Sequence, residues 1–376
     1  MKGGIRIQDA VVGDIEPTET ELSLIEDPAM QRLRWIRQVG FANLIYPSAN
    51  HTRFEHSLGT MKRTRELSSR LNGGEPDEAL EAAGLMHDIG HTAFSHASDN
   101  LLGRYLKTTH EDLGEEIIRK SSIADVIGNS TFTMKKVLDY FNGKSKGEVV
   151  TGSIGSDRLD YLIRDAHYTG VAYGLIDYSN IRNKFTLYKG SPAIFESAVR
   201  SVEYMLIARY SMFSSVYLHH AAQIADGMYE KAVANAIDSG KMDAKELRNI
   251  VDWSMTAKLL ATKDSKDLMQ RLLERRLFKR AYNNAVPVGL KLSEVASAIE
   301  KSGMDRNSYV AVFVEYKGSK DNLPVVNRDG QLVGQITEVS PLMKTLQLIL
   351  SSAPKLLVAC DRKNTEKINS ALKKLL

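Results

Sequence analysis

Residues 85–96 read LMHDIGHTAFSH and place His87, Asp88, His91 and His96 within ten positions of the chain. A histidine next to an aspartate offers a neutral nitrogen and an anionic oxygen, a pair that suits a divalent cation of intermediate hardness. A buried histidine whose ring nitrogens are satisfied by a neighbouring carboxylate gives the same pattern. His87 and Asp88 alone leave both interpretations open, so the rest of the chain must separate them.

The residues before this stretch predict a helix that carries His87 on its inward face. Pro76 fits the first turn, where its missing N–H is not needed. Leu80, Ala83, Gly84 and His87 follow at positions i, i+3, i+4 and i+7, which share one helical face. The spacing favours a buried His87, whether it is a ligand or a core histidine.

Composition restricts the class of protein. The chain has 376 residues, 43% of them hydrophobic, and more than one domain is expected because single cores rarely exceed about 250–300 residues. The 50 basic and 46 acidic residues are mostly interleaved, so the formal charge of +4 does not by itself argue for nucleic acid. A single cysteine, Cys360, excludes an internal disulfide and a multi-cysteine zinc site. With no apolar leader pattern and no apolar run of about 20 residues, we expect a soluble cytoplasmic protein without a membrane partner.

Helical periodicity dominates the chain until about residue 305. The elements expected before residue 240 are extended segments 5–7 and 10–12, a helix capped by Thr18 or Thr20, helices 28–39, 53–71, 76–87, 97–106 and 192–238, and a helix capped by Thr108 or Thr109. After residue 240 we expect a helical region over 243–282 and a final helix over 365–375. Strands are expected at 309–316 and 355–360, and two short strands should flank a turn at Asp329-Gly330. The predicted fold is mainly α with a small C-terminal α+β domain, divided as 1–235, 236–305 and 306–376.

Residues 151–174, TGSIGSDRLDYLIRDAHYTGVAYG, form another informative stretch. Leu159, Leu162 and Ile163 make an apolar face, while acidic, arginine and tyrosine side chains occupy the neighbouring turns. That mixture is unusual for a helix with a purely structural role.

Four fragments stand in order along the chain: RFEHSLGT with His56, LMHDIGH with His87 and Asp88, THE with His110, and SDRLDYLIRD with Asp157. Their combination closely resembles the HD-domain phosphohydrolases, and within them the dNTP triphosphohydrolase branch. QRLRWIRQVG, residues 31–40, is also similar to an element of that branch. The resemblance covers roughly residues 1–235 and implies an HD-domain helical core there.

The resemblance implies that His56, His87, Asp88 and Asp157 bind a metal ion. Two imidazoles and two carboxylates leave coordination positions open for water and a phosphate oxygen, as a catalytic site requires. Such an ion polarises the phosphoryl group and lowers the pKa of a bound water. This ligand set accepts Mn, Mg, Fe, Ni, Co or Zn and does not choose among them.

The resemblance also makes His110 the candidate proton donor to the leaving oxygen, with Glu111 as an orienting carboxylate. A histidine titrates near neutral pH and suits this role. His91 and His96 are expected to orient ligands or contact phosphate. The alternative, that both are satisfied within the fold, stays open.

Further residues match positions that contact phosphate or sugar in the dNTP triphosphohydrolase branch. The predicted substrate contacts are Arg53, His96, Arg158, Tyr161, Asp165, Arg209 and Tyr217. Arginine can hold phosphate oxygens bidentately, although Arg209 and Tyr217 also fit a packed or solvated role. Phe213 stands where the branch often carries a histidine, which leaves both the substrate and any nucleotide-dependent regulation open.

The preferred interpretation is a metal-dependent enzyme that converts a dNTP and water to deoxynucleoside and triphosphate. A phosphomonoesterase or phosphodiesterase acting on another nucleotide is the alternative within the enzyme class. A non-catalytic HD module is the alternative outside it, with the basic run 271–280 or the C-terminal unit engaging a nucleic acid or another partner. Family members commonly pair through the helical core, so a homo-oligomer is expected.

Overall fold

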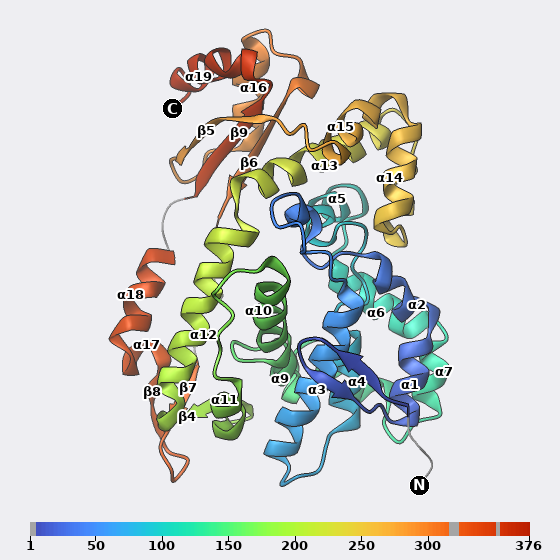
Figure 1. The fold of residues 1–376 in the computed structure, drawn as a ribbon, viewed down its shortest axis with the longest axis vertical. Helices are drawn as coiled ribbons and strands as arrows, with labels where there is room; N and C mark the ends of the chain where they lie inside the picture. Colours follow the sequence, from blue (N-terminus) through green and yellow to red (C-terminus); the bar gives the residue numbers. More distant parts are fainter. Residues whose placement is uncertain (1–4, 316–322, 351–353) are drawn as a thin grey trace.

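The computed structural model describes residues 5–315, 323–350 and 354–376. Its helices are distributed along the long axis of the molecule, and three small sheets of the described residues lie among them (Figure 1). The predicted mainly α fold, with a helical core and small sheets contributed by the C-terminal part, is confirmed. None of the described helices has the length and apolar character needed to span a membrane.

The N-terminal segment begins with a β-hairpin rather than the two extended segments that were predicted. Its strands are β1 (Ile7–Asp9) and β2 (Gly13–Ile15), followed by α1 (Glu19–Glu26), α2 (Pro28–Gln31), η1 (Arg32–Trp35) and η2 (Gly40–Leu44). Thr18 caps α1 through a capping box, as expected. The predicted helix 28–39 was too long, because Ile36 is extended and Arg37 forms a β-bridge with Thr52.

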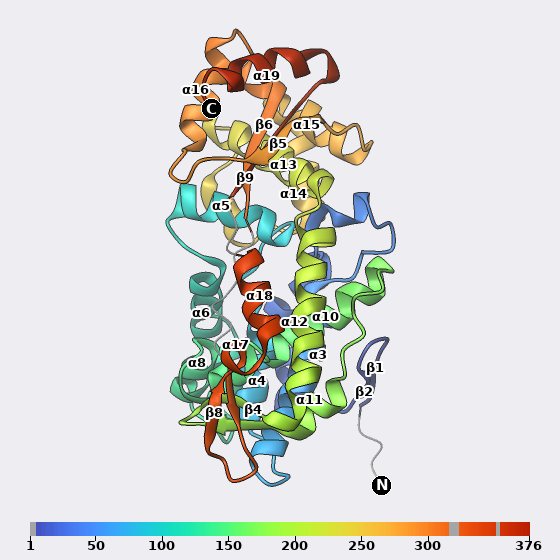
Figure 2. The same ribbon diagram turned by 90° about the vertical axis from the view of Figure 1, so that its left-hand side faces the viewer.

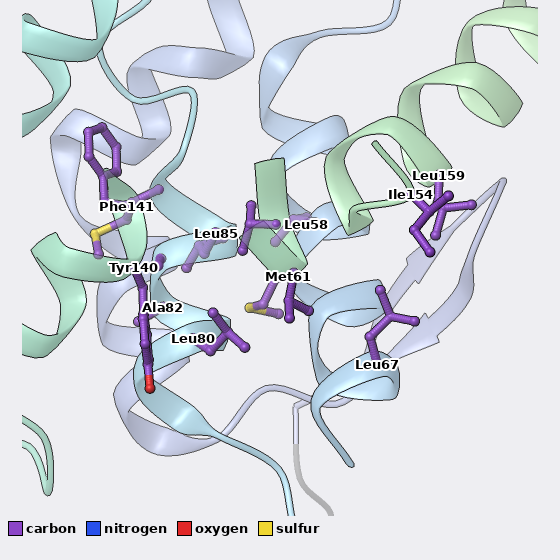
Figure 3. Packing of buried hydrophobic residues seen from close by; sticks show 14 of the residues in the cluster. Leu58, Met61, Leu67, Leu80, Ala82, Leu85, Tyr140, Phe141, Ile154 and Leu159 are labelled. Atoms are coloured by element: carbon purple, nitrogen blue, oxygen red, sulfur yellow. The ribbon is translucent and has the colours of Figure 1, made fainter. Parts of the chain in front are cut away.

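Three helices form the centre of the fold: α3 (Arg53–Leu71), α4 (Glu78–Met86) and α10 (Ser156–Thr169). Helix α3 packs against both α4 and α10. Figure 3 shows Leu58 and Met61 of α3 close to Leu80 and Leu85 of α4 within one continuous apolar core. This packing fixes α3, α4 and α10 relative to one another.

Shorter helices connect α4 to α10. They are η3 (Ser95–Ser98), α5 (Asp99–Leu101), η4 (Leu102–Leu106), α6 (His110–Lys120), α7 (Ile123–Gly128), α8 (Met134–Phe141), η5 (Ser145–Gly147) and α9 (Glu148–Thr151). Thr109 caps α6, one of the two predicted caps. The helix predicted over 97–106 is a succession of 3₁₀, α and π turns instead.

The helix predicted over 192–238 is wrong at its start and is interrupted. The chain continues as α11 (Tyr178–Lys184), β3 (Phe185–Tyr188), β4 (Ser191–Phe195), η6 (Glu196–Ala198), α12 (Val199–Met212), η7 (Phe213–Tyr217) and α13 (His220–Asp238). Lys189 and Gly190 adopt positive φ and close the β3–β4 hairpin, which places Pro192 in a strand. Between η7 and α13, His219 has a non-helical conformation and accepts a hydrogen bond from the backbone N–H of Ala221.

The helical region predicted over 243–282 also ends early. Its elements are η8 (Ala244–Arg248), α14 (Asp252–Ala261), α15 (Lys263–Leu273) and β5 (Lys279–Ala285). Arg275 turns the chain with φ 54°, and β5 then pairs antiparallel with β9 (Lys355–Cys360). Pairing with a strand far along the sequence overrides the local helical pattern of residues 279–282.

The last part of the chain contributes to two sheets. Its remaining elements are α16 (Leu292–Lys301), η9 (Arg306–Ser308), β6 (Tyr309–Val314), β7 (Pro324–Val326), β8 (Leu332–Gln335), α17 (Ile336–Val339), α18 (Pro341–Leu350), η10 (Arg362–Asn364) and α19 (Thr365–Lys373). The Asp329-Gly330 turn, the strand 355–360 and the final helix are confirmed, while Tyr316, the predicted end of β6, lies outside the described residues.

The two sheets lie at different places along the molecule. One has the strand order β5-β9-β6 and lies with α16 and α19 at one end of the long axis (Figure 1). In the other, β7 pairs in parallel with β4, giving the order β3-β4-β7-β8 beside α11 and α12 (Figure 2). The predicted division into three domains stays a prediction.

Candidate metal centre and catalytic site

Three elements of the core bring together the four side chains that were expected to bind metal. His56 lies on α3, His87 and Asp88 follow at the C-terminus of α4, and Asp157 lies in the first turn of α10. His56 and Asp88 are buried. The close packing of α3 against α4 and α10 holds them in place.

The donor atoms of these side chains face one another. His56 Nε2 lies 3.2 Å from His87 Nε2, and Asp157 Oδ1 lies 3.1 Å and 3.5 Å from these two nitrogens. Asp88 contributes Oδ2 at 3.6 Å from His56 Nε2 and Oδ1 at 3.5 Å from His87 Nε2. Metal–ligand bonds of about 2.0–2.2 Å place neighbouring donors roughly 3 Å apart, so this spacing fits a coordination sphere.

Both histidines are held in the tautomer that a metal ion needs. His87 Nδ1 lies 2.9 Å from the carbonyl oxygen of Gly84, and His56 Nδ1 lies 2.9 Å from Asp160 Oδ2. Each Nδ1 therefore carries a hydrogen and donates it, so Nε2 is the nitrogen that each ring presents to the cluster.

The electrostatics of the cluster favour a cation. Burial lowers the pKa of His56, but hydrogen bonds with Asp157 and Asp160 outweigh it and raise the pKa to about 10. Burial alone would raise the pKa of Asp157, yet its hydrogen bonds with His56 and His87 lower it. Buried carboxylates that remain ionised attract positive charge, so the residues present fit a divalent metal ion.

A second cluster adjoins the first and contains His91, His96, Asp99 and His110, whose nearest ligand-type atoms all lie within 4.8 Å of one another. The rings of His91 and His110 stack with centroids 3.8 Å apart. Asp99 accepts from His110 Nδ1 at 3.0 Å and from His96 Nδ1 at 2.9 Å. His91 Nε2 lies 3.4 Å from Asp88 Oδ1, which connects the two clusters.

The two stacked histidines have opposite pKa shifts. Burial and the positive charges of Arg53 and His110 lower the pKa of His91 well below its usual value. Burial also lowers the pKa of His110, but the hydrogen bond to Asp99 and the charge of Asp99 outweigh it and raise the pKa. An imidazole that gives up its proton more readily thus lies against one that holds its proton more strongly, an arrangement suited to proton transfer.

The loop between His91 and His96 has an unusual backbone. Phe94 and Ser95 adopt φ 58° and 55°, a region that costs free energy for residues other than glycine. Packing compensates for this cost: the ring of Phe94 stacks on Phe41 at 4.3 Å, and its N–H donates to Asp252 Oδ1 at 2.7 Å. Asp252, at the start of α14, thereby helps to shape this loop.

The chain resembles known proteins over its whole length. A model of the HD domain matches residues 53–150, and a model of the HD associated region matches residues 176–376. An uncharacterized protein of Methanocaldococcus jannaschii is 32% identical over 98% of this chain and 84% of its own length. The crystal structure of a hypothetical protein from Aquifex aeolicus matches with a TM-score of 0.80 and 30% identity, covering 98% of this chain and 99% of that one.

The chain belongs to the HD-domain phosphohydrolases. A more distant relative, the human deoxynucleoside triphosphate triphosphohydrolase SAMHD1, is 25% identical over 86% of this chain and 62% of its own length.

Arg53 lies between the two clusters of this HD domain. Its Nη1 forms a buried ion pair with Asp88, and its Nε donates to Ser95 Oγ at 2.7 Å. Its other terminal nitrogen, Nη2, is buried and has no hydrogen-bond partner among the residues that the structure describes.

Five of the predicted substrate contacts form a network next to His56. The Tyr161 ring lies 6.5 Å from the His56 ring and 6.2 Å from the Tyr217 ring. Tyr217 donates to Asp165 Oδ2 at 2.5 Å. Tyr161 shares a hydrogen bond with Arg209, and the positive charge of Arg158 also acts on it.

The remaining predicted site residues differ in exposure. The side chain of Glu111 is 61% exposed, with Oε1 3.2 Å from His110 Nε2. His96 is 70% exposed at the edge of the second cluster. Thus the structure brings His91, His96, Asp99 and His110 together next to Asp88, while Arg158, Tyr161, Asp165, Arg209 and Tyr217 gather next to His56.

Several polar residues of the HD site were not predicted from the sequence. Asp99 and Asp160 follow predicted site residues by three positions, and that helical spacing was a usable signal. His51, which lies 2.7 Å from Asp165 Oδ1, is 114 positions from its partner. Arg32 donates to the carbonyl oxygens of Ile89 and His91 at 2.6 Å and 2.8 Å and so fixes the loop after Asp88. For His51 and Arg32 the sequence offers no local signal.

Proposed function

We propose that this HD-domain phosphohydrolase converts a deoxynucleoside triphosphate and water to deoxynucleoside and triphosphate. The observation that carries the proposal is that the first cluster adjoins two different groups of side chains. Protonatable histidines adjoin it through Asp88, and arginine, tyrosine and aspartate side chains suited to a nucleotide adjoin it through His56. The distant human relative bears the name of this activity.

His56, His87, Asp88 and Asp157 would hold one divalent ion in this proposal. Once bound, the ion supplies Lewis-acid polarisation of the phosphoryl group and acidifies a coordinated water. The nitrogen and oxygen donors accept Mn, Mg, Fe, Ni, Co or Zn.

The phosphates would be held by arginines. The unpartnered Nη2 of Arg53 is a buried donor next to Asp88, and a phosphate oxygen would satisfy it. Arg158 and Arg209 add positive charge beside Tyr161. A triphosphate carries several negative charges, and Arg53, Arg158 and Arg209 would together supply the positive charge that holds it.

His110 would donate a proton to the leaving oxygen. Water attacks the α-phosphorus, the bond between that phosphorus and the 5′ oxygen breaks, and the proton moves from His110 Nε2 to that oxygen. Asp99 keeps Nδ1 occupied, so Nε2 is the nitrogen available for donation. Glu111 lies near Nε2 and is exposed, so its side chain would move away when the substrate binds next to Nε2.

The deoxynucleoside would contact the network around Asp165. His51 and Tyr217 each occupy one of its carboxylate oxygens, which fixes the carboxylate while leaving lone pairs for a sugar hydroxyl. The Phe213 and Tyr217 rings, 5.0 Å apart, offer an apolar surface next to this carboxylate.

The nucleic-acid alternative loses support from the contacts of the basic run 271–280. Arg271 is paired with Asp267 and Asp361, Arg275 donates to the carbonyl oxygen of Leu44, and Arg276 is paired with Glu274. Three of the five cations of the run are thus bonded within the fold, while Lys279 and Arg280 are exposed at the start of β5, which shortens the row of cations available to phosphates. Homo-oligomerisation stays a prediction that light scattering on the purified chain can test.

A product assay tests the proposal directly. The purified chain is incubated with each dNTP and with Mn²⁺, Mg²⁺, Ni²⁺ or Co²⁺, and the products are separated by chromatography. Equal amounts of deoxynucleoside and triphosphate are expected. Release of phosphate or of a nucleoside monophosphate would assign the site to a different phosphohydrolase reaction, and the absence of every product would contradict the proposal.

A further inference from the structure

We propose that Asp160 is a positioning residue for His56, and that Arg164 and Asp9 hold Asp160 in place. The inference rests on the proposed role of His56 as a metal ligand. It adds a line of buried charges, Asp9–Arg164–Asp160–His56, that runs from the N-terminal hairpin to the metal centre.

The contact between Asp160 and His56 lies on the side of the ring away from the other ligands. His56 Nδ1 donates to Asp160 Oδ2 at 2.9 Å, while His56 Nε2 faces His87 and Asp157. Both His56 and Asp160 are fully buried. Because water cannot replace Asp160 there, this carboxylate alone sets the tautomer and the orientation of the imidazole.

Arg164 restrains Asp160 with two hydrogen bonds. Its Nε donates to Asp160 Oδ2 at 2.7 Å and its Nη2 donates to Oδ1 at 3.1 Å, one helical turn along α10. Such a fork fixes the plane of the carboxylate and not merely its position. The pKa of Asp160, which burial alone would raise, is lowered by the charge of Arg164 and by these hydrogen bonds.

Asp9 restrains the far end of Arg164. Arg164 Nη1 donates to Asp9 Oδ2 at 2.8 Å, and Nη2 donates to Asp9 Oδ1 at 3.2 Å. Asp9 Oδ1 also accepts from the backbone N–H groups of Val11 and Val12, which form the turn of the β1–β2 hairpin. The hairpin turn, Arg164 and the metal ligand are therefore connected through consecutive short contacts.

The backbone of α3 makes room for this line at Gly59. A Cβ at Gly59 would lie 2.2 Å from Asp160 Oδ1 and 2.3 Å from Arg164 Nη2, which is closer than packed atoms approach. Glycine at this position lets the Asp160–Arg164 pair lie directly against α3, which carries His56.

The charges of the line dictate which variants are informative. Removing Arg164 would take away the cation that pairs with both buried carboxylates, leaving Asp160 with Arg63, whose Nε lies 3.5 Å from its Oδ1, and would threaten the fold itself. Asp160→Asn keeps the volume, but its NH2 group faces an N–H donor whichever oxygen it replaces: Arg164 Nη2 at Oδ1, or His56 Nδ1 and Arg164 Nε at Oδ2. Asp9→Asn leaves Asp160 intact and weakens only the restraint on Arg164.

The test measures Mn²⁺ affinity in the absence of any nucleotide. Metal-stripped full-length wild type, Asp160→Asn, Asp9→Asn and a control, Glu81→Gln, are titrated calorimetrically with Mn²⁺, and their folding is compared by circular dichroism. Glu81 is a buried carboxylate paired with Arg65 and has no contact with His56. We expect affinity to fall about 10–100-fold in Asp160→Asn, by a smaller factor in Asp9→Asn, and not at all in Glu81→Gln.

A second measurement separates positioning from a merely structural role. At saturating Mn²⁺, kcat of the folded Asp160→Asn protein should recover toward the wild-type value while the KM for the dNTP is unchanged. Wild-type Mn²⁺ affinity in Asp160→Asn would overturn the proposal. If Asp160→Asn fails to fold, Asp9→Asn decides, and unchanged affinity there overturns it. Wild type that binds Mn²⁺ but hydrolyses no nucleotide would contradict only the proposed function.

Discussion

His91 and His110 are stacked in nearly parallel planes, yet their surroundings give them different protonation states. Arg53 disfavours a proton on His91, whereas Asp99 stabilises one on His110. Two identical side chains are thus prepared for different tasks by the charges beside them. A sequence displays the histidines but not which carboxylate faces which ring.

This difference predicts a pH dependence for the hydrolysis. A raised pKa means that His110 keeps its proton to higher pH, so kcat/KM should decline only as pH rises through that raised value. In Asp99→Asn the stabilising charge is lost and the decline should begin at lower pH. Profiles of kcat/KM between pH 5 and about 9 measure this. Glu115→Gln, a partly exposed residue of α6 that pairs with Arg119, serves as the control. An unmoved alkaline limb in Asp99→Asn would remove His110 from the role of acid.

The two carboxylates of the metal centre should respond differently to substitution. Asp157 contacts the histidines at 3.1 Å and 3.5 Å, whereas Asp88 also neutralises the buried Arg53. Asp157→Ala should lose bound metal and lower hydrolysis by at least about 100-fold while the protein stays folded. Asp88→Ala should do the same and also lose about 3–5 kcal/mol of stability, because Arg53 is left buried and unpaired. Metal analysis and urea unfolding measure both effects, and equal stability of the two variants would contradict this account.

At the scale of elements, the position of α6 depends on Gly90. A Cβ at Gly90 would lie 1.9 Å from the carbonyl oxygen of His110 and 2.4 Å from the backbone nitrogen of Gly114, so the first turn of α6 rests directly on this residue. Gly90→Ala should push α6 away and take His110 with it.

We expect kcat to fall by about 10-fold or more in Gly90→Ala, since proton transfer contributes roughly 10²–10⁴-fold and depends on this geometry. Stability should fall by about 1–3 kcal/mol from overpacking. Gly103→Ala is the matched control, because nothing lies within 4 Å of its added Cβ. Steady-state kinetics and thermal unfolding give the readouts. Equal kcat in the two variants would show that α6 need not rest on Gly90.

Elements with a local signal were predicted well, and those fixed by distant partners were not. Thr18 and Thr109 cap helices as their sequence context indicates, and Asp329-Gly330 forms the expected turn. Residues 279–282 continue a helical pattern but belong to β5, because their partner strand β9 lies more than seventy residues later. No short stretch of the sequence contains both strands, so the local pattern cannot reveal that they pair.

The residues of the candidate site show the same difference between those with a local sequence signal and those without one. His56, His87, Asp88 and Asp157 were expected to meet and they do, since α3, α4 and α10 pack together, while His110 of the remaining motif lies on α6 in the adjoining cluster. Asp160 and Asp99 follow them at helical spacing but had no motif to mark them. The role of Asp9 could not be predicted from the sequence, because the packing of the N-terminal hairpin is what brings Asp9 to Arg164.

At the scale of the whole molecule, the C-terminal part completes the core that holds the metal centre. The hairpin β7–β8 extends the β3–β4 sheet. Val325 of β7, Leu323 just before it and Ile336 just after β8 belong to the same apolar cluster as Leu58 and Met61 of α3. The segment predicted as a separate small domain therefore stabilises residues more than 200 positions earlier.

This arrangement predicts that a substitution after the hairpin destabilises the helical core. Ile336 is fully buried in that cluster, so Ile336→Ala should lower the free energy of unfolding by about 2–5 kcal/mol. Leu332, two-fifths exposed on β8, is the matched control, and Leu332→Ala should change stability by at most about 0.5 kcal/mol. Urea unfolding followed by far-ultraviolet circular dichroism reports mainly on the helices of the core. If the core unfolds at the same urea concentration in Ile336→Ala as in the wild type, the hairpin does not share its stability, and the two parts behave as independent folding units.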